Sequence, residues 1–366
     1  MVNRNHATMF FTVAPKPDLD EPTAAAAYVR AAAHLAALPE GAAEADGYRL
    51  FWARGEEVGH RDIGADDHAV VGRHSACDVA LAAASELSLR HLLVAATSLA
   101  DGAPALRVLD LHASLPFYTD DGQPRRSIVA TGPVVLRLGT YLFGGVPIGP
   151  SIPRALLPDE MPRAVVTHSI RPPADERTSR HLQTPAEMST MGPDEDDFYD
   201  PPPPSPPPPL ATSPAVSPLL SRVTVVPKAA FLTDVAPPST RTAFARLTLL
   251  RDGHSASIDL PADDLDGGVL IGRSERCTDG GLRRVLDGNI SRVHALLLRE
   301  GDDIVAFDLC STQGMYLDGR LVRRHRLSRA GGCLSLARTN PVMLCLHPRS
   351  EDAAPDGPGD RHEPRP

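Results

Sequence analysis

The residues best suited to chemistry lie in three short stretches of the C-terminal third of the chain. The first ends in Arg273, the second joins Ser291 to His294 across two residues, and the third is the Ser-Thr-Gln-Gly loop at 311–314. Arginine presents a planar fork of N–H donors that binds a phosphate through two hydrogen bonds. Hydroxyl groups and glycine-rich backbone supply further donors. These residue types indicate an anion-binding site.

Three motifs of this region recur in the same order earlier in the chain, at offsets of 198 to 203 residues. Three motifs in one order are much rarer by chance than any one alone, so the chain is predicted to hold two copies of one domain. The pairs are Gly72-Arg73 with Gly272-Arg273, Ser88-x-x-His91 with Ser291-x-x-His294, and Asp110 and Tyr118 with Asp308 and Tyr316.

Short apolar or alternating runs, separated by Gly, Asp and Pro turns, predict β-strands in both copies. Leu93–Ala95 and Leu106–Leu109 form one predicted hairpin, and Ala295–Leu298 and Ile304–Phe307 form the other. Many short strands in so few residues predict an all-β fold of two sandwiches. Further predicted strands are Val134–Leu138, Phe244–Leu250, Val269–Ile271 and Met343–Leu346.

The C-terminal motifs resemble those of the forkhead-associated (FHA) domain family. That family shows G-R, then S-R-x-H, then D-L-G-S-T-N-G-T-Y-V-N-G. The resemblance runs from near Arg246 to Leu346 and implies a β-sandwich that binds phosphothreonine peptides. The matching segments are Gly272-Arg273, Ser291-Arg292-Val293-His294, and the run from Asp308 to Gly319, which reads D-L-C-S-T-Q-G-M-Y-L-D-G.

The resemblance also implies roles for single residues. Arg273 and Ser291 would contact the phosphate, with Thr312 as a supporting contact and Arg292 beside the phosphothreonine. Gln313 stands where the family has an asparagine whose amide holds the peptide backbone, so its extra methylene changes that contact. The residues with an implied structural role near the site are Gly272, His294 and Gly314.

The N-terminal copy has lost part of the family pattern. Leu115 replaces the asparagine amide, and Pro116 replaces the glycine, which restricts φ and removes a donor. A structural or protein-docking role is therefore favoured over phosphopeptide binding. The residues of the possible vestigial site are Arg73, Ser88 and His91.

Proline marks the boundary between the copies, because residues 147–238 hold 22 of the 37 prolines. Such a segment cannot bury enough apolar surface to offset its ordering entropy. The predicted parts are an N-terminal extension at 1–45, a degenerate FHA-like sandwich at 46–148, a disordered Pro-rich linker at 149–242, an FHA domain at 243–348 and a disordered tail at 349–366.

Two segments outside the copies carry open alternatives. The Ala-rich run Ala24–Leu38 predicts a helix that is either packed on a neighbour or exposed at the surface. The linker threonines are either ordinary residues or, when phosphorylated, ligands that the C-terminal copy binds from its own chain. These threonines are Thr167, Thr178, Thr184, Thr190 and Thr212.

Composition excludes several classes of protein. The net charge of −9 argues against a non-specific nucleic-acid binder, and no 18-residue apolar run predicts a membrane span. Five cysteines without a CxxC disfavour a zinc site and a disulfide framework, and we expect a reducing, cytoplasmic location. Phosphate-loop, nucleophile-elbow and kinase motifs are missing, so we expect no enzyme and no cofactor or metal.

The function expected from the resemblance is a non-catalytic, phosphothreonine-dependent adaptor in Ser/Thr kinase signalling. Its partner would be a phosphothreonine-containing protein, either a Ser/Thr kinase or a kinase substrate, bound by the C-terminal copy. The alternative is a scaffold that docks partners through both sandwiches without phosphate.

Overall fold

A computed structural model provides the structure of the chain. The helices of its described part include none with the length and apolar character of a membrane span. The described residues of both copies of the repeat belong to one compact unit. The described residues are 19–38, 46–99, 102–150, 157, 165–168, 222–225, 243–275, 277, 280–328 and 331–348.

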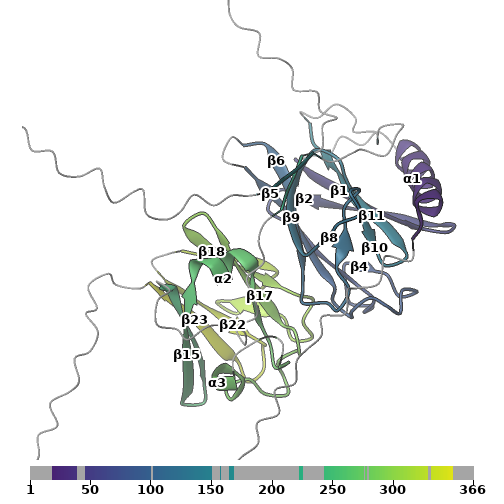
Figure 1. Cartoon of the computed structure of the whole chain (residues 1–366). Coiled ribbons are helices and arrows are strands. Elements are labelled where there is room, and N and C mark those ends of the chain that lie inside the picture. The colour runs from purple at the N-terminus through teal and green to yellow at the C-terminus, as the bar shows by residue number, and fades with distance from the viewer. Residues whose placement is uncertain are drawn as a thin grey trace, which may run out of the picture. The chain divides into compact units, whose positions relative to one another are not determined.

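The N-terminal copy is a sandwich of two sheets (Figure 1). One sheet has the order β2 (Glu57–Gly64), β1 (Gly47–Arg54), β11 (Tyr141–Ile148), β10 (Val134–Leu138), β7 (Phe117–Tyr118) and β8 (Pro124–Arg125). The other has the order β12 (Val165–His168), β13 (Arg222–Val225), β9 (Ser127–Thr131), β6 (Pro104–Asp110), β5 (Leu92–Ser98), β3 (His68–Gly72) and β4 (Val79–Ala80).

The C-terminal copy is a second sandwich with two short helices, α2 (Ala262–Gly267) and α3 (Gly280–Arg283). One sheet has the order β15 (His254–Pro261), β14 (Ala243–Arg251), β23 (Val342–Pro348), β22 (Gly332–Leu336), β19 (Met315–Leu317) and β20 (Arg320–Val322). The other has the order β16 (Val269–Ile271), β17 (Ala295–Glu300), β18 (Asp303–Asp308) and β21 (Arg324–Leu327).

The two sandwiches share one topology. The order β2-β1-β11-β10-β7-β8 corresponds strand by strand to β15-β14-β23-β22-β19-β20, and β3-β5-β6-β9 corresponds to β16-β17-β18-β21. Both predicted hairpins form, with Leu93 opposite Leu109 in one and Leu296 opposite Phe307 in the other. The predictions of an all-β fold and of a repeated sandwich are confirmed.

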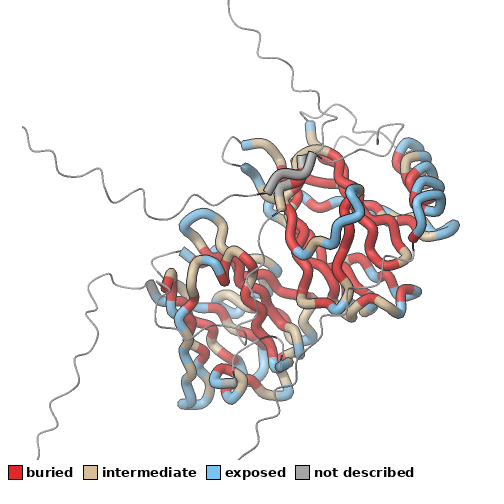
Figure 2. The backbone as a smooth tube through the Cα atoms, in the orientation of Figure 1, coloured by how far each residue is buried: buried red, intermediate tan, exposed pale blue. Residues whose placement is uncertain are grey.

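Alternating side chains place each copy's core between its two sheets, because successive residues of a strand point to opposite faces. On β17, Ala295 and Leu297 point into the core of the C-terminal sandwich. The intervening Leu296 and Leu298 are also buried, but they belong to a different cluster. Figure 2 shows buried backbone along the central strands of both sandwiches. These strands are therefore covered on both faces.

The cluster on the outer face joins the two sandwiches. It contains Val70, Leu93 and Leu109 from the N-terminal copy together with residues of the C-terminal copy. We call the contact between the copies the seam. All of its buried members except Val305 correspond in the repeat, so equal positions of the two copies pack in one cluster. The corresponding pairs are Val70 and Leu270, Cys77 and Cys277, Leu93 and Leu296, Ala95 and Leu298, Leu109 and Phe307, and Leu111 and Leu309.

Helix α1 (Glu21–Ala36) packs on the opposite side of the N-terminal sandwich. Asp20 caps it, accepting a hydrogen bond from the Thr23 N–H at 2.9 Å. Its alanine face and Tyr28 are buried against Phe51 and Leu142. Of the two alternatives for this helix, the packed one is correct, because small alanine side chains allow the helix to approach the sheet closely.

Strands β12 and β13 lie inside residues 149–242, which the sequence indicates as a disordered linker. They pair with each other in parallel, and β13 extends the sheet at the edge of β9. Four-residue runs such as Arg222–Val225 carry too little pattern to be separated from the linker by sequence. Thr167 lies in β12, whereas Thr178, Thr184, Thr190 and Thr212 lie outside the described residues.

One disulfide contradicts the expectation drawn from the cysteine count. Cys333 on β22 and Cys345 on β23 are directly opposite each other and are bonded, with Cα atoms 4.1 Å apart. Their separation of 12 residues gave no sign of this register. The free cysteines are Cys77, Cys277 and Cys310. The described residues contain no group of three or more His, Cys, Asp or Glu side chains suited to a metal ion.

Candidate functional site

Arg273 stands on the turn that follows β16. Its Nε donates to the carbonyl oxygen of Ile290 at 2.8 Å, and its backbone N–H donates to the carbonyl of Ser291 at 3.3 Å. Among the described residues, its two terminal guanidinium nitrogens make no other hydrogen bond. A Cβ on Gly272 would lie 2.3 Å from the Arg292 carbonyl oxygen, so glycine is required at this turn. The side chain is thus anchored at its base and exposed at its tip.

Ser291 and Thr312 lie next to each other although they are 21 residues apart. The backbone N–H of Thr312 donates to Ser291 Oγ at 3.0 Å, and the two side-chain oxygens are 3.5 Å apart. The structure therefore brings the serine of one loop and the threonine of the next together at the same edge of the sandwich as Arg273.

His294 holds these two loops in place. Its Nδ1 accepts a hydrogen bond from the Ser291 backbone N–H at 3.3 Å, so its Nε2 carries the proton donated to the Gly314 carbonyl at 3.0 Å. Burial lowers the pKa of the ring to about 4, so the ring is neutral at pH 7. The N-terminal copy keeps the same bridge, where His91 joins the Ser88 N–H to the Leu115 carbonyl.

The loop from Asp308 to Gly314 is closed by its own polar groups. Ser311 Oγ donates to Asp308 Oδ1 at 2.5 Å and accepts the Gly314 N–H at 2.9 Å. Burial raises the pKa of Asp308. Cys310 has a φ of +51° and Gly314 a φ of +76°. Cys310 therefore adopts a left-handed conformation at a position where the family pattern has glycine.

The predicted site residues line two hollows. One, of about 440 Å³, is basic, because Arg273, Arg283 and Arg284 line it. Its carboxylate, Asp287, is already paired with Arg251 at 2.8 Å. Arg276, which the sequence places in the same basic stretch, lies outside the described residues.

The second hollow, of about 370 Å³, lies at the seam. Thr312 and Gln313 line it from the C-terminal copy, and Ala76 and Asp78 line it from the N-terminal copy. The predicted site residues are thus divided, with Gln313 in the seam hollow and Arg273 in the basic hollow. Arg292 is exposed nearby, and its carbonyl accepts the Ser274 N–H at 3.0 Å.

The corresponding loop of the N-terminal copy is built differently. Arg126 pairs with Asp110 and donates to the carbonyl of Ala113 at 2.7 Å, which closes the loop. Leu115, at the position of Gln313, packs against the hydrophobic core. Arg73 remains exposed on its turn. This loop has exchanged its polar tip for internal contacts.

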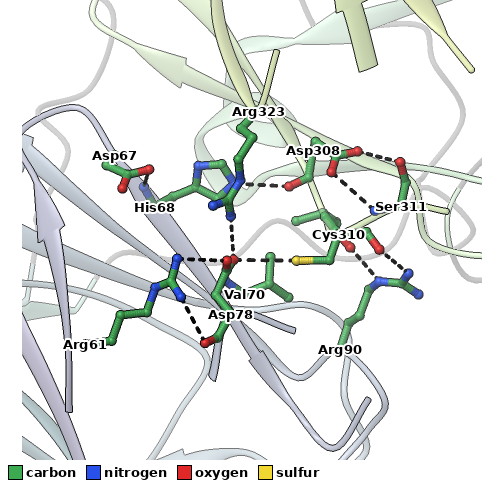
Figure 3. A network of polar contacts seen from close by, with 11 residues as sticks. Arg61, Asp67, His68, Val70, Asp78, Arg90, Asp308, Cys310, Ser311 and Arg323 are labelled. Atoms are coloured by element: carbon green, nitrogen blue, oxygen red, sulfur yellow. Dashed lines mark hydrogen bonds and ion pairs between the residues drawn. The ribbon is translucent and has the colours of Figure 1, made fainter. Parts of the chain in front are cut away.

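A polar network at the seam was not predicted from the sequence (Figure 3). Arg90 of the N-terminal copy donates from Nε to the Leu309 carbonyl at 2.5 Å and from a terminal nitrogen to the Cys310 carbonyl at 2.6 Å. Asp78 of the same copy pairs with Arg323 of the other at 2.5 Å. The only signal in the sequence was Arg90 itself, the one arginine between Arg73 and His91.

Comparison with known proteins places these motifs in a family. Residues 269–330 match the family model described as the FHA domain. No curated protein matches the chain.

Solved FHA domains resemble parts of the chain at low identity. Mycobacterium tuberculosis Rv1747 FHA-1 is 23% identical over 29% of this chain and 100% of its own, with a TM-score of 0.23. The FHA domain of Chlamydia trachomatis CT664 protein is 24% identical over 29% and 99%, with a TM-score of 0.23. The yeast Dun1 FHA domain, solved with a doubly phosphorylated peptide, is 14% identical over 40% and 96%, with a TM-score of 0.26.

Proposed function

The C-terminal sandwich carries an FHA domain at residues 269–330, and from this premise we propose that it binds phosphothreonine in a partner protein. FHA domains are phosphothreonine-binding protein-interaction modules. The chain would act as a non-catalytic adaptor that recognises a protein after a Ser/Thr kinase has phosphorylated it.

One observation carries the proposal, namely that Arg273 lies on the turn bonded to the Ser291 backbone while Ser291 and Thr312 are bonded to each other. Arg273 offers two guanidinium nitrogens that bond to no other residue of the described part of the chain, and Ser291 offers a hydroxyl. A phosphothreonine carries a charge of about −1.5 to −2 and three acceptor oxygens at neutral pH. Each charge-assisted hydrogen bond to it contributes about 1.5–3 kcal/mol. The resulting affinity would be moderate and reversible, as signalling requires.

The basic hollow adds a long-range attraction for such a ligand. Arg283 and Arg284 lie on the same side as Arg273. Arg283 is 3.5 Å from the exposed carboxylate of Glu275, and this weak surface pair leaves most of its field available. We expect this side of the site to favour acidic or phosphorylated residues beside the phosphothreonine.

Substitution of the proposed contacts tests the function. Arg273→Ala or Ser291→Ala in the full chain should lower affinity for phosphothreonine peptides at least tenfold, measured by calorimetry against an oriented peptide library pool. Arg246→Ala, at an exposed ion pair with Asp259, is the matched control and should bind normally. Arg73→Ala tests the N-terminal copy and should also bind normally.

Retained binding in both Arg273→Ala and Ser291→Ala would disprove the proposed site. Partner capture that survives phosphatase treatment would instead support the phosphate-independent scaffold. The same assay, run with chain phosphorylated by a Ser/Thr kinase, tests binding of the chain's own threonines, because occupied sites would no longer take up added peptide.

A further inference from the structure

We propose that the N-terminal sandwich, although its own loop has eroded, completes the phosphopeptide site of the C-terminal sandwich. It would hold the loop from Leu309 to Gly314 in position and form one wall of the hollow beside Gln313. The ligand would then be a phosphothreonine peptide that crosses the seam and contacts both copies. This inference rests on the proposed function of the C-terminal copy.

The first support is the apolar seam, which fixes one sandwich on the other. The outer faces of β3, β5 and β6 meet those of β16, β17 and β18 in one buried cluster. Leu93, Leu296 and Phe307 are each at most 1% exposed. Burial of several such apolar side chains stabilises the contact between the two sandwiches. The N-terminal copy is therefore a fixed neighbour of the C-terminal loop.

The second support is Arg90, whose guanidinium holds two successive carbonyls of that loop. Its hydrogen bonds to the carbonyls of Leu309 and Cys310, at 2.5 and 2.6 Å, orient the two peptide planes that lead into Ser311. His68 of the N-terminal copy adds a third bond, from Nε2 to the Asp308 carbonyl at 3.0 Å. Three consecutive carbonyl groups of the C-terminal copy thus accept hydrogen bonds from the N-terminal copy.

The arginine has no counterpart at the equivalent position of the C-terminal copy. That position is Val293, whose side chain has no charged donor. Arg90 acts as a positioning residue, because its contacts are with the loop backbone.

The third support is the seam hollow. Thr312 and Gln313 of the C-terminal copy line it, together with Ala76 and Asp78 of the N-terminal copy. The charge of Asp78 is matched by Arg323 at 2.5 Å and by Arg61 at 3.2 Å. A hollow whose charges are paired internally suits an uncharged side chain. A peptide held by its phosphate at Ser291 and passing Gln313 would place such a side chain there.

The test of positioning uses the full chain and a library of peptides with a fixed phosphothreonine. Arg90→Ala should lower affinity for the pool about tenfold. Arg90→Lys, which can satisfy only one carbonyl, should be intermediate. The amide NMR signals of Thr312 and Gly314 should shift in Arg90→Ala. Arg49→Ala, at the pair with Asp62 on β1 and β2, is the control and should change neither affinity nor these signals.

A second test asks whether the N-terminal copy forms one wall of the seam hollow. It uses a substitution that leaves the C-terminal copy unchanged. Ala76→Trp should fill the hollow and change the residue preference at one library position, with the phosphate dependence kept. The control is Ala80→Trp, at another exposed alanine of the N-terminal copy, which should keep the native preference.

The outcomes separate the two proposals. If Arg273→Ala abolishes binding while Arg90→Ala and Ala76→Trp behave like native chain, the N-terminal copy has no part in the site and this inference is wrong. If Arg273→Ala and Ser291→Ala both bind normally, the proposed function itself fails and the inference fails with it.

Discussion

At the scale of single residues, the loops of the site depend on a buried neutral histidine. Burial lowers the pKa of His294 to about 4, below the value of about 6.5 in an unfolded chain. As pH falls, the unfolded chain binds the proton first. The stability from the neutral ring is therefore complete above about pH 6.5 and is lost toward pH 4, with about 2 kcal/mol lost at pH 5.

Urea unfolding at pH 7 and pH 5 measures this loss. His294→Gln should be less stable at pH 7, because it breaks the bridge between the loops, but its stability should change less between the two pH values. Part of the pH dependence should remain, because burial also lowers the pKa values of His91 and His68. If the stability of the variant and of the native chain changes equally between pH 7 and pH 5, His294 is not the source of the pH dependence.

Gln313 supports a second prediction at this scale. Gln313 lines the seam hollow, and fixing a glutamine side chain costs more rotamer entropy than fixing a shorter one. Gln313→Asn should therefore bind phosphothreonine peptides at least as tightly as native chain, whereas Gln313→Ala should bind several-fold more weakly. Fluorescence anisotropy with one selected peptide measures both. Tighter binding by Gln313→Ala would show that the amide does not contact the ligand.

At the scale of elements, helix α1 is part of the N-terminal sandwich. Tyr28 is 2% exposed, while its neighbour Val29 is 63% exposed. Tyr28→Ala should lower the free energy of unfolding by about 3–5 kcal/mol, and Val29→Ala by less than about 0.5 kcal/mol. Denaturant titration of the two variants provides the comparison. Equal effects would mean that the helix does not pack in solution.

The disulfide between β22 and β23 supports a prediction for the C-terminal sandwich. Its loop of 12 residues is short, so breaking it should lower stability by about 2–3 kcal/mol. Thermal unfolding with and without reductant measures the difference. Cys333→Ser should unfold at one temperature in both conditions. If the unfolding temperature of the native chain is the same with and without reductant, the bond is absent in solution.

The elements also show how far sequence reasoning reaches. Hairpins such as Ala295–Leu298 with Ile304–Phe307 were predictable, because their apolar runs and turn are local signals. The disulfide and β13 were not, because both depend on which strands become neighbours. One signal of the seam was present, since Val70 and Leu93 extend their apolar runs beyond strict alternation. Such runs indicate strands buried on both faces.

The candidate site also contains residues that could be predicted from the sequence and residues that could not. Arg273, Ser291 and Thr312 could be predicted because family motifs carry their spacing, and the structure brings them to one edge of the sandwich. Arg90 and Asp78 could not be assigned, because they act across the seam on a loop about 220 residues away in sequence.

At the scale of the whole molecule, we expect a single buried charge at the seam to separate the two sandwiches. Leu296→Asp would place a carboxylate in the buried cluster, where an unpaired charge is strongly unfavourable. The sandwiches should separate, the radius of gyration from small-angle scattering should increase, and phosphopeptide affinity should fall as in Arg90→Ala. The control is Leu250→Asp, at a position that is 39% exposed. An unchanged radius with normal binding would contradict the role of the seam.

The correspondence of residues across the seam has a consequence for how such a molecule arises. Equal faces that meet in one cluster are the mark of a two-fold homodimer, here joined within one polypeptide. Covalent linkage frees the halves from identity, so one can retain the ligand loop while the other keeps Arg90. It also makes their association independent of dilution, unlike that of separate subunits. Duplication followed by division of labour would thus give the proposed ligand site a support that is always present.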